Sequence, residues 1–297
     1  MTALDQAFIK AYRQPLTSSR AEPAPHFPKP CSVMAVEPPR EESQHFGRAV
    51  ETVGATATVE AAAPPAEAFS PAADAVPLSP TFQVDGFRWP KVCGLLRAAA
   101  VGQWQALTDV LASAAQAGQK ILAIATAQAG EGSTTVVLCS GRILAERDLR
   151  VVLVDATFSD PQLARRLGLA PESGWEEVLA GRMSLADTLI EAADGRMAIL
   201  PVREPLTGVA GPRDEVTIAE NLAALADHYD LVLVDWGALD RYTAGPSLAR
   251  GIGKCLDGLA LVRNTHFTRK DRWEQVDRAV RQAGIPLLGV IQNFQRT

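Results

Sequence analysis

The chain has 297 residues, enough for one large domain or two small ones, and hydrophobic residues make up 47% of it. Its formal net charge is −5, so no overall basic surface favours nucleic acid as a partner. The four cysteines lie far apart with no CxxC pair, which argues against a zinc site or a disulfide framework. No apolar run approaches the roughly 20 residues that span a bilayer, so we expect a cytoplasmic protein that reaches a membrane only through a partner.

Composition predicts that residues 1–85 form a disordered tail. Thirteen of the twenty prolines fall within residues 1–90, and a segment of this kind cannot bury enough apolar surface to offset the entropy cost of ordering it. A short helix over residues 2–13 is the exception, because apolar side chains would share one of its faces, at Leu4, Phe8, Ile9 and Tyr12. A helix this short is marginal alone, so two interpretations stay open: a docking peptide that folds on a partner, or a frayed terminus.

From residue 86 to residue 297, segments of helical character alternate with short apolar strands. The predicted helices cover residues 92–117, 136–145, 161–167, 175–179, 185–193, 216–228 and 269–283. The predicted strands cover residues 121–127, 151–154, 197–202, 229–235, 256–262 and 287–292. This alternation predicts one α/β domain with a mostly parallel sheet and helices on both faces.

The stretch from residue 121 to residue 155 has the pattern of a phosphate-binding βαβ unit. A buried strand runs into a glycine-bearing turn, Gly130-Glu131-Gly132, and three hydroxyl residues then open a helix, Ser133, Thr134 and Thr135. Glycines let the backbone approach an anion, while the N–H groups and dipole of the helix start hold it. The next strand ends in Asp155, and a later apolar strand ends in Asp235. Because ligands bind at the carboxyl ends of parallel strands, we expect the turn and both acids to lie at one edge of the sheet.

Two kinds of phosphate site compete for this motif. A dinucleotide fold wants G-x-G-x-x-G, but Thr135 stands in the place of the third glycine, although Asp155 lies where an acid would bind a ribose. A P-loop wants Gly-Lys-Ser/Thr at the helix start, and the run from Gly132 to Thr134 has the hydroxyl for Mg²⁺ without the lysine. Asp235 fits the Walker-B acid of a P-loop protein. Each motif alone is a partial match.

Six further segments resemble a known family in order and spacing. They are GQKILAIATAQAGEGSTT, LRVVLVDATFSDPQLARRLGL, SGWEEVLAGRMSLADTLIEA, MAILPV, YDLVLVD and IPLLGVIQNF. The family is that of the CpsD/CapB-like bacterial tyrosine kinases of exopolysaccharide synthesis, relatives of the MinD/ParA ATPases, and the resemblance covers roughly residues 90–297. It implies a P-loop NTPase-like fold, ATP with Mg²⁺, tyrosine phosphorylation and a membrane-embedded activator from the polysaccharide export system.

The resemblance also assigns site residues, with clear departures. Ser133 stands where the family has its phosphate-binding lysine, and Thr157 replaces the second acid of the family's Asp-x-Asp motif, whose first acid corresponds to Asp155. Asp235 matches the Walker-B position, and Asn293 matches a residue that often contacts adenine. The implied nucleotide-binding residues are Gly130, Glu131, Gly132, Ser133, Thr134, Thr135 and Asn293. The implied Mg²⁺ ligands are Thr134, Asp155 and Asp235, and in an active enzyme the two acids are catalytic.

Three functional hypotheses follow. The first is a pseudokinase that binds nucleotide weakly or not at all and serves as a regulator or scaffold. Its partner would be a membrane-embedded polysaccharide chain-length or export protein or another kinase subunit, with recruitment to the inner face of the membrane and homo-oligomers as further options. The second is an active tyrosine kinase in which Arg142 or Arg263 replaces the lysine, and the third is a dinucleotide-dependent enzyme. The pair Arg165-Arg166 is expected on a solvated helix face, with contact to the acidic surface of a partner as the alternative.

Overall fold

A computed structural model of the chain describes residues 36–37, 78–206, 212–239 and 251–293. The chain divides into two compact units, and the described residues all belong to the first, made of residues 1–38 and 78–297. The docking helix predicted at residues 2–13 lies outside the described residues, and the division at residue 85 stays a prediction. Within the described part, no helix combines the length and apolar character needed to cross a membrane.

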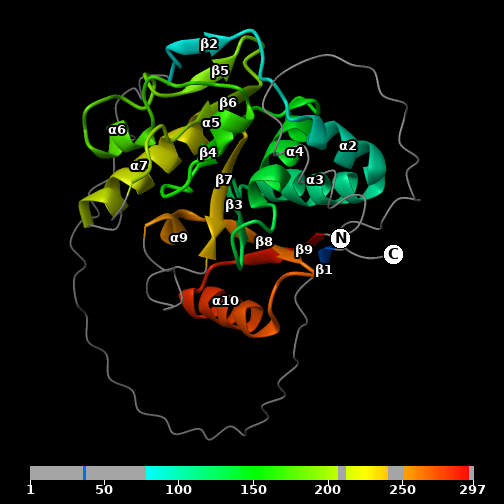
Figure 1. Cartoon of the computed structure of the whole chain (residues 1–297). Coiled ribbons are helices and arrows are strands. Elements are labelled where there is room, and N and C mark those ends of the chain that lie inside the picture. Colours follow the sequence, from blue (N-terminus) through cyan, green and yellow to red (C-terminus); the bar gives the residue numbers. More distant parts are fainter. Residues whose placement is uncertain (1–35, 38–77, 207–211, 240–250, 294–297) are drawn as a thin grey trace, which may run out of the picture. The chain divides into compact units, whose positions relative to one another are not determined.

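The first unit is built on one sheet, in the order β1-β9-β8-β3-β7-β4-β6-β5-β2 (Figure 1). Its strands are β1 (Val36–Glu37), β2 (Phe82–Val84), β3 (Ile121–Thr126), β4 (Val151–Asp155), β5 (Ile190–Ala192), β6 (Met197–Leu200), β7 (Leu231–Ala238), β8 (Gly258–Asn264) and β9 (Leu287–Asn293). Neighbours from β9 to β6 pair in parallel, whereas β1 with β9 and β5 with β6 pair antiparallel. The mostly parallel α/β fold predicted from the sequence is confirmed. The sheet also takes in β1 and β2, which precede the predicted start of the domain.

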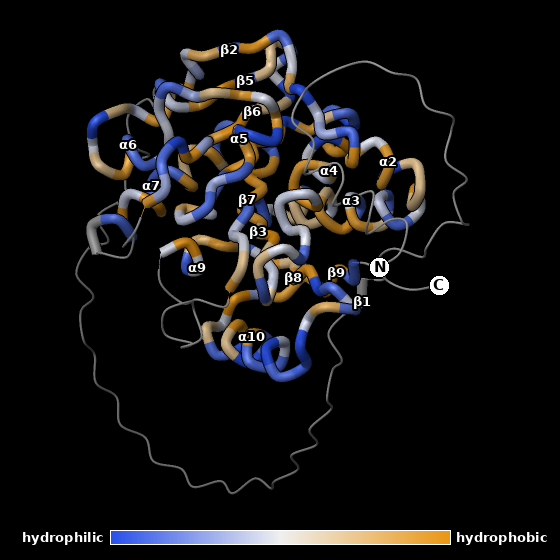
Figure 2. The backbone as a smooth tube through the Cα atoms, viewed as in Figure 1, coloured by the Kyte–Doolittle hydropathy of each residue, from blue (hydrophilic) through white to orange (hydrophobic). Residues whose placement is uncertain are grey.

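Helices cover both faces of this sheet. They are α2 (Lys91–Ala99), α3 (Val101–Gln116), α4 (Ser133–Ala145), α5 (Leu163–Arg166), α6 (Trp175–Leu179), α7 (Pro212–His228), α9 (Ile252–Cys255) and α10 (Lys270–Ala283). Along β3, Ala123 and Ala125 face the core that contains α6, α7 and α10. Leu122 and Ile124 face the opposite core, with α2, α3, α4 and α5. Figure 2 shows the result: the central strands are mostly hydrophobic and α10 is mostly hydrophilic, as expected when both faces of a parallel sheet are covered.

Two predicted helices are corrected by the structure. The helix predicted over residues 92–117 is two helices, because Ala100 adopts non-helical angles (φ −142°, ψ 49°) and joins α2 to α3. The helix predicted over residues 185–193 does not form: residues 186–188 make a turn, and strand β5 follows, with Ile190 and Ala192 buried and Glu191 half-buried. Pairing with β6 and β2 fixes this strand, and such sheet contacts override a local helical pattern.

The order of the strands distinguishes a P-loop fold from a dinucleotide-binding fold. Although α4 joins β3 directly to β4, strand β7 lies between them and pairs in parallel with both. In a dinucleotide fold the first two consecutive strands are neighbours. Here the strand that enters the glycine turn instead lies beside the strand that carries Asp235, and Asp235 pairs in register with Asp155 on β4. The glycine turn and both acids therefore meet at one edge of the sheet.

Candidate nucleotide site

The glycine turn has a backbone that favours glycine at two positions. Gly130 and Gly132 have φ angles of +87° and +106°, in the left-handed region. Gly132 is the N-cap of α4, and its carbonyl accepts the first helical hydrogen bond, from the N–H of Val136 at 3.0 Å. The N–H groups of the first helical turn, which begins at Ser133, have no partner within the helix. This is the arrangement with which a helix start binds an anion.

Glu131 points into the protein and holds the turn in shape. Its side chain is fully buried, and its Oε2 accepts a hydrogen bond from the N–H of Gln128 at 3.0 Å. Its Oε1 accepts a hydrogen bond from the hydroxyl of Thr268, and its carbonyl accepts one from Nδ2 of Asn293 at 3.0 Å. A Cβ on Gly132 would lie 2.8 Å from the same Nδ2. Glu131 and Asn293, both assigned to nucleotide from the sequence, contact the loop itself in this structure.

Asp235 is a buried acid whose two oxygens are bonded unequally. Its Oδ1 accepts a hydrogen bond from the N–H of Gly237 at 3.3 Å, while its buried Oδ2 has no hydrogen-bond partner among the described residues. Burial raises the pKa of Asp235 to about 7, and the charge of Asp155 adds to the rise. The hydroxyls of Thr134 and Ser133 lie close enough to lower this pKa in part, as does the positive charge of Arg166.

Asp155, by contrast, is bonded on both oxygens to its own chain. Its Oδ1 accepts from the N–H and hydroxyl of Thr157, at 3.1 and 2.5 Å, and its Oδ2 accepts from the N–H groups of Gln162 and Leu163, both at 3.0 Å. Burial raises its pKa, and these hydrogen bonds oppose the rise. The carboxylate anchors the start of α5 to the end of β4. Of the two acids assigned to Mg²⁺, Asp235 thus has the freer oxygen.

These residues fit a magnesium nucleotide in part. Magnesium prefers oxygen ligands and is usually held by one or two protein groups together with substrate phosphates. The buried Oδ2 of Asp235 and the nearby hydroxyl of Thr134 supply such groups. Among the described residues no cluster of three or more His, Cys, Asp or Glu side chains would hold a metal without the phosphates.

The two arginines considered as substitutes for the lysine are each stacked on a tryptophan ring. Arg142 stacks over the ring of Trp89 at 5.4 Å and donates to Glu146 at 3.1 Å, in the last turn of α4. Arg263 stacks over the ring of Trp273 on α10 at 5.0 Å. Neither contributes to the pKa of Asp235 as Arg166 does.

Arg166, which the sequence predicted to lie on a solvated helix face, instead lies next to the helix start of this site. Its Nη1 donates to Oγ1 of Thr135, in the first turn of α4, at 3.0 Å. Only Arg165 lies on the solvated face expected for the pair, since Arg166 is half-buried. A signal was present in the sequence: Leu163 and Leu167 are four residues apart and define the inward face of α5, and Arg166 is three residues from the first and next to the second.

The glycine loop, the neighbouring Asp235 strand and the helices on both faces define the class, a P-loop NTPase-like α/β protein. Known proteins agree with that class. The kinase domain of Escherichia coli tyrosine kinase ETK superposes with a TM-score of 0.57 at 21% identity, covering 74% of this chain and 93% of that one. The VpsO kinase domain gives a TM-score of 0.55 at 24% identity, covering 69% and 98%. These structures show the fold.

Sequence comparison points to the same group. No protein-family model matches the chain. The chain is 21% identical over 175 residues to the tyrosine-protein kinase CpsD of Streptococcus agalactiae, covering 59% of this chain and 75% of CpsD. It is 30% identical over 121 residues to the maintenance of carboxysome distribution protein A of Synechococcus elongatus, covering 37% of this chain and 46% of that protein. The chain thus spans about half of one relative and three quarters of the other, and its resemblance to the CpsD-like bacterial tyrosine kinases is confirmed.

Proposed function

We propose that this chain is a nucleotide-binding relative of the bacterial tyrosine kinases whose phosphoryl transfer is severely weakened. It acts as a regulatory or scaffolding subunit in polysaccharide synthesis. The observation that carries the proposal is the first turn of α4, where the glycine loop is kept but Ser133 occupies the place of the lysine. Phosphoryl transfer depends on positioning and on stabilising charge. Loss of one such contact costs on the order of 10²–10³ in rate.

The residues present support binding more than catalysis. The N–H groups at the start of α4 would bind phosphate oxygens, and Thr134 with Asp235 would hold Mg²⁺, which neutralises charge on the phosphates when bound. Asp155 is already bonded to Thr157 and to the start of α5, so it is poorly placed to act as a second metal ligand or as a base.

The tyrosines of the chain also favour a role in which it acts together with a partner protein. Tyr229 is 1% exposed and its hydroxyl donates to Oε1 of Glu191 at 3.3 Å, so it is not a site for phosphorylation in the folded chain. The other tyrosines, Tyr12 and Tyr242, lie outside the described residues. By its resemblance to the family, the chain would act with a membrane-embedded polysaccharide chain-length or export protein, with another kinase subunit, or as a homo-oligomer. Such a partner would recruit it to the inner face of the membrane.

A second candidate is a working tyrosine kinase, favoured by the presence of Arg166 close to Asp235. Incubation of the purified chain with γ-labelled ATP, Mg²⁺ and a tyrosine-containing peptide separates the two. We expect ATP and ADP to raise the thermal midpoint. Transfer to tyrosine should stay close to that of a Thr134→Ala, Asp235→Ala double variant. Transfer well above that variant would establish the kinase instead.

The dinucleotide hypothesis is tested in the same thermal-shift series. The position of β7 between β3 and β4 disfavours it, so NAD should leave the midpoint unchanged where ATP raises it. A shift with NAD and none with ATP would contradict the proposal.

A further inference from the structure

We propose that Arg166, on α5, is the phosphate-binding cation of this site and supplies the positive charge that the glycine loop lacks. This inference rests on the proposed nucleotide binding and assigns the side chain that binds the phosphates. It starts from the contact between Nη1 of Arg166 and Oγ1 of Thr135, which brings a guanidinium to the first turn of α4. That turn is where the loop and the helix start would bind an anion.

The position of Arg166 is fixed by Asp155. Both N–H groups that open α5, those of Gln162 and Leu163, are bonded to Oδ2 of Asp155 at 3.0 Å. Leu163 and Leu167 are buried in the core shared with α4. The four-residue helix is therefore held at its start by the carboxylate and along one face by apolar packing, with Arg166 in its last turn. Asp155 is thus a positioning residue for Arg166.

The electrostatic interactions at this edge of the sheet agree with the position of Arg166 near the site. Asp235 is fully buried, and Arg166 is the basic side chain whose charge favours the ionised form of Asp235. The charge of Arg166 is therefore felt at the acid that would hold Mg²⁺ beside the phosphates. A guanidinium carries five N–H donors in a planar fork that matches phosphate oxygens, so one group can bond to Thr135 and to a phosphate together.

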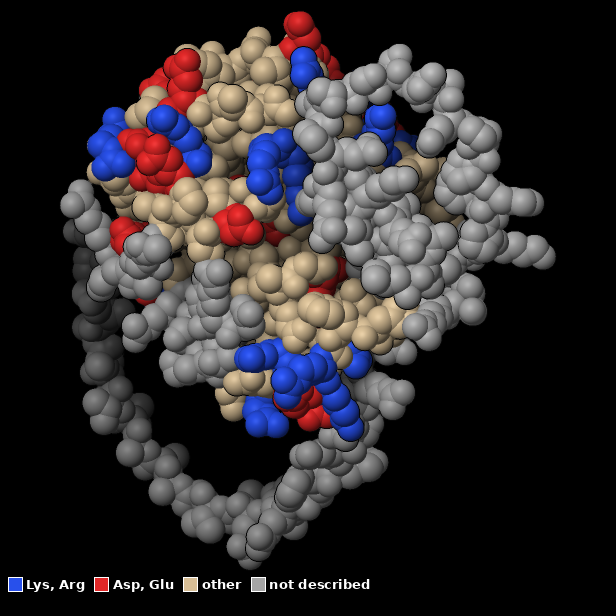
Figure 3. Space-filling model, in the orientation of Figure 1, with Lys and Arg blue, Asp and Glu red and all other residues tan. Residues whose placement is uncertain are grey.

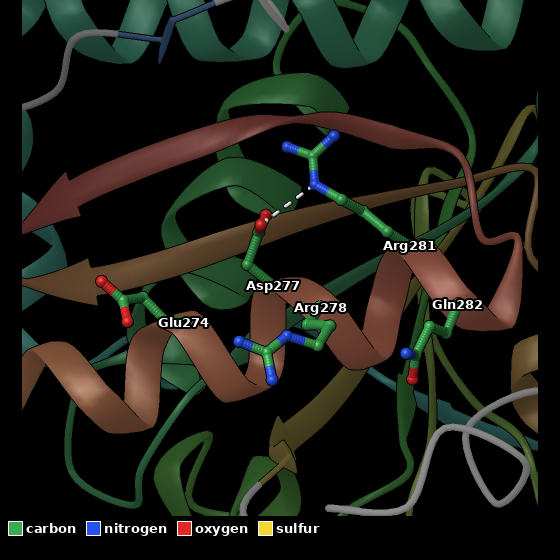
Figure 4. A pocket seen from close by; sticks show the side chains of 5 residues that line it. All are labelled: Glu274, Asp277, Arg278, Arg281 and Gln282. Carbon is green, nitrogen blue, oxygen red and sulfur yellow. Dashed lines mark hydrogen bonds and ion pairs between the residues drawn. The ribbon is translucent and has the colours of Figure 1, made fainter.

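The other prominent basic residues do not serve this site. Figure 3 shows Lys and Arg side chains gathered over α10, mixed with acids. Figure 4 shows the hollow on that helix, where Arg281 donates to Asp277 at 3.0 Å. Helix α10 packs against the face of the sheet opposite to α4. The arginines of that hollow, Arg278 and Arg281, therefore lie on the other side of the sheet from α4.

The test measures binding of ATP with Mg²⁺, of inorganic tripolyphosphate and of adenosine to the full chain by calorimetry. We expect Arg166→Gln to weaken the two phosphate ligands by about 10- to 100-fold and to leave adenosine unchanged, as for loss of a hydrogen bond to a charged group. Arg165→Gln is the matched control, since Arg165 is the exposed neighbour whose side chain bonds to Gln162. It should bind all three ligands like the wild type.

Two further variants separate charge from structure. In the Arg166→Gln background, Ser133→Lys should restore most of the lost affinity. Should Arg166→Gln unfold, as seen by circular dichroism, Arg166→Lys keeps the charge without the fork and is expected to bind phosphate more weakly than the wild type.

The outcomes distinguish the two proposals. If the wild type binds ATP but Arg166→Gln binds it equally well, the assignment of Arg166 is wrong while the proposed function stands. If Ser133→Lys in the Arg166→Gln background restores no phosphate binding, the loss came from structure and not from charge, and the assignment is again wrong. If the wild type binds neither ATP nor tripolyphosphate, both proposals are overturned.

Discussion

Replacing Asp235 by asparagine should stabilise the chain, and more so at alkaline than at acid pH. The folded state raises the pKa of this acid from 3.8 to about 7, mainly through burial. Between these values the folded state holds a proton that the unfolded state has released, so the free energy of unfolding falls as the pH rises. From pH 5 to pH 8 that loss is about 3 kcal/mol, because stability falls by roughly 1.4 kcal/mol per pH unit between the two pKa values and levels off above pH 7.

An asparagine cannot ionise, so the Asp235→Asn variant escapes this loss. Urea unfolding at pH 5, 6, 7 and 8 should show the advantage of the variant growing by about 3 kcal/mol across the series. Asp187→Asn is a control variant for which we expect the opposite change in stability. Asp187 accepts hydrogen bonds from Ser184 and Thr81, which lower its pKa, so removing its charge should cost stability at pH 8. Equal pH dependence in wild type and Asp235→Asn would refute the reasoning.

Three further substitutions test the loop, the anchor of α5 and the missing lysine. Gly132→Ala should cost about 1–2 kcal/mol of unfolding free energy, because its φ is left-handed and its Cβ would crowd Asn293, whereas Gly94→Ala in open space on α2 should gain up to about 1 kcal/mol. Asp155→Ala leaves the start of α5 unbonded, and hydrogen exchange at residues 162–166 should rise above wild type while exchange in α10 stays unchanged. Ser133→Lys should raise transfer from ATP by about 10²–10³-fold over wild type, with Ser133→Ala as the control that adds no charge; no gain would mean that other departures limit catalysis.

The sequence predicted correctly those elements that depend on a local pattern of residues. Apolar runs located the central strands, and the glycines near residue 130 located the turn, because these features depend on neighbours in the chain. Strand β5 was mistaken for part of a helix because its parallel partner β2 lies far earlier in the chain and was not recognised as a strand, although its antiparallel partner β6 was. The break at Ala100 depends in the same way on how α2 and α3 pack, which periodicity does not report.

The candidate site was predictable as a set of positions but not as a set of contacts. The sequence placed Asp155 and Asp235 at strand ends, and both lie there in neighbouring strands. Which oxygens are already bonded depends on the path of residues 157–163, and this made Asp155 an anchor and left Asp235 with the unpartnered oxygen. The inward turn of Glu131 depends on Thr268, which is 137 residues away.

The departures from the family pattern balance one another in charge. Ser133 in place of lysine removes one positive charge, and Thr157 in place of the second acid removes one negative charge from the same edge. A carboxylate at Thr157 would stand beside Asp155 and near Asp235, both fully buried, and each added like charge raises the cost of keeping the others ionised. Instead the hydroxyl of Thr157 donates to Asp155, which a carboxylate does not do. The two departures together leave the net charge at this edge of the sheet unchanged. A Thr157→Asp variant should therefore destabilise the wild type more than it destabilises Ser133→Lys.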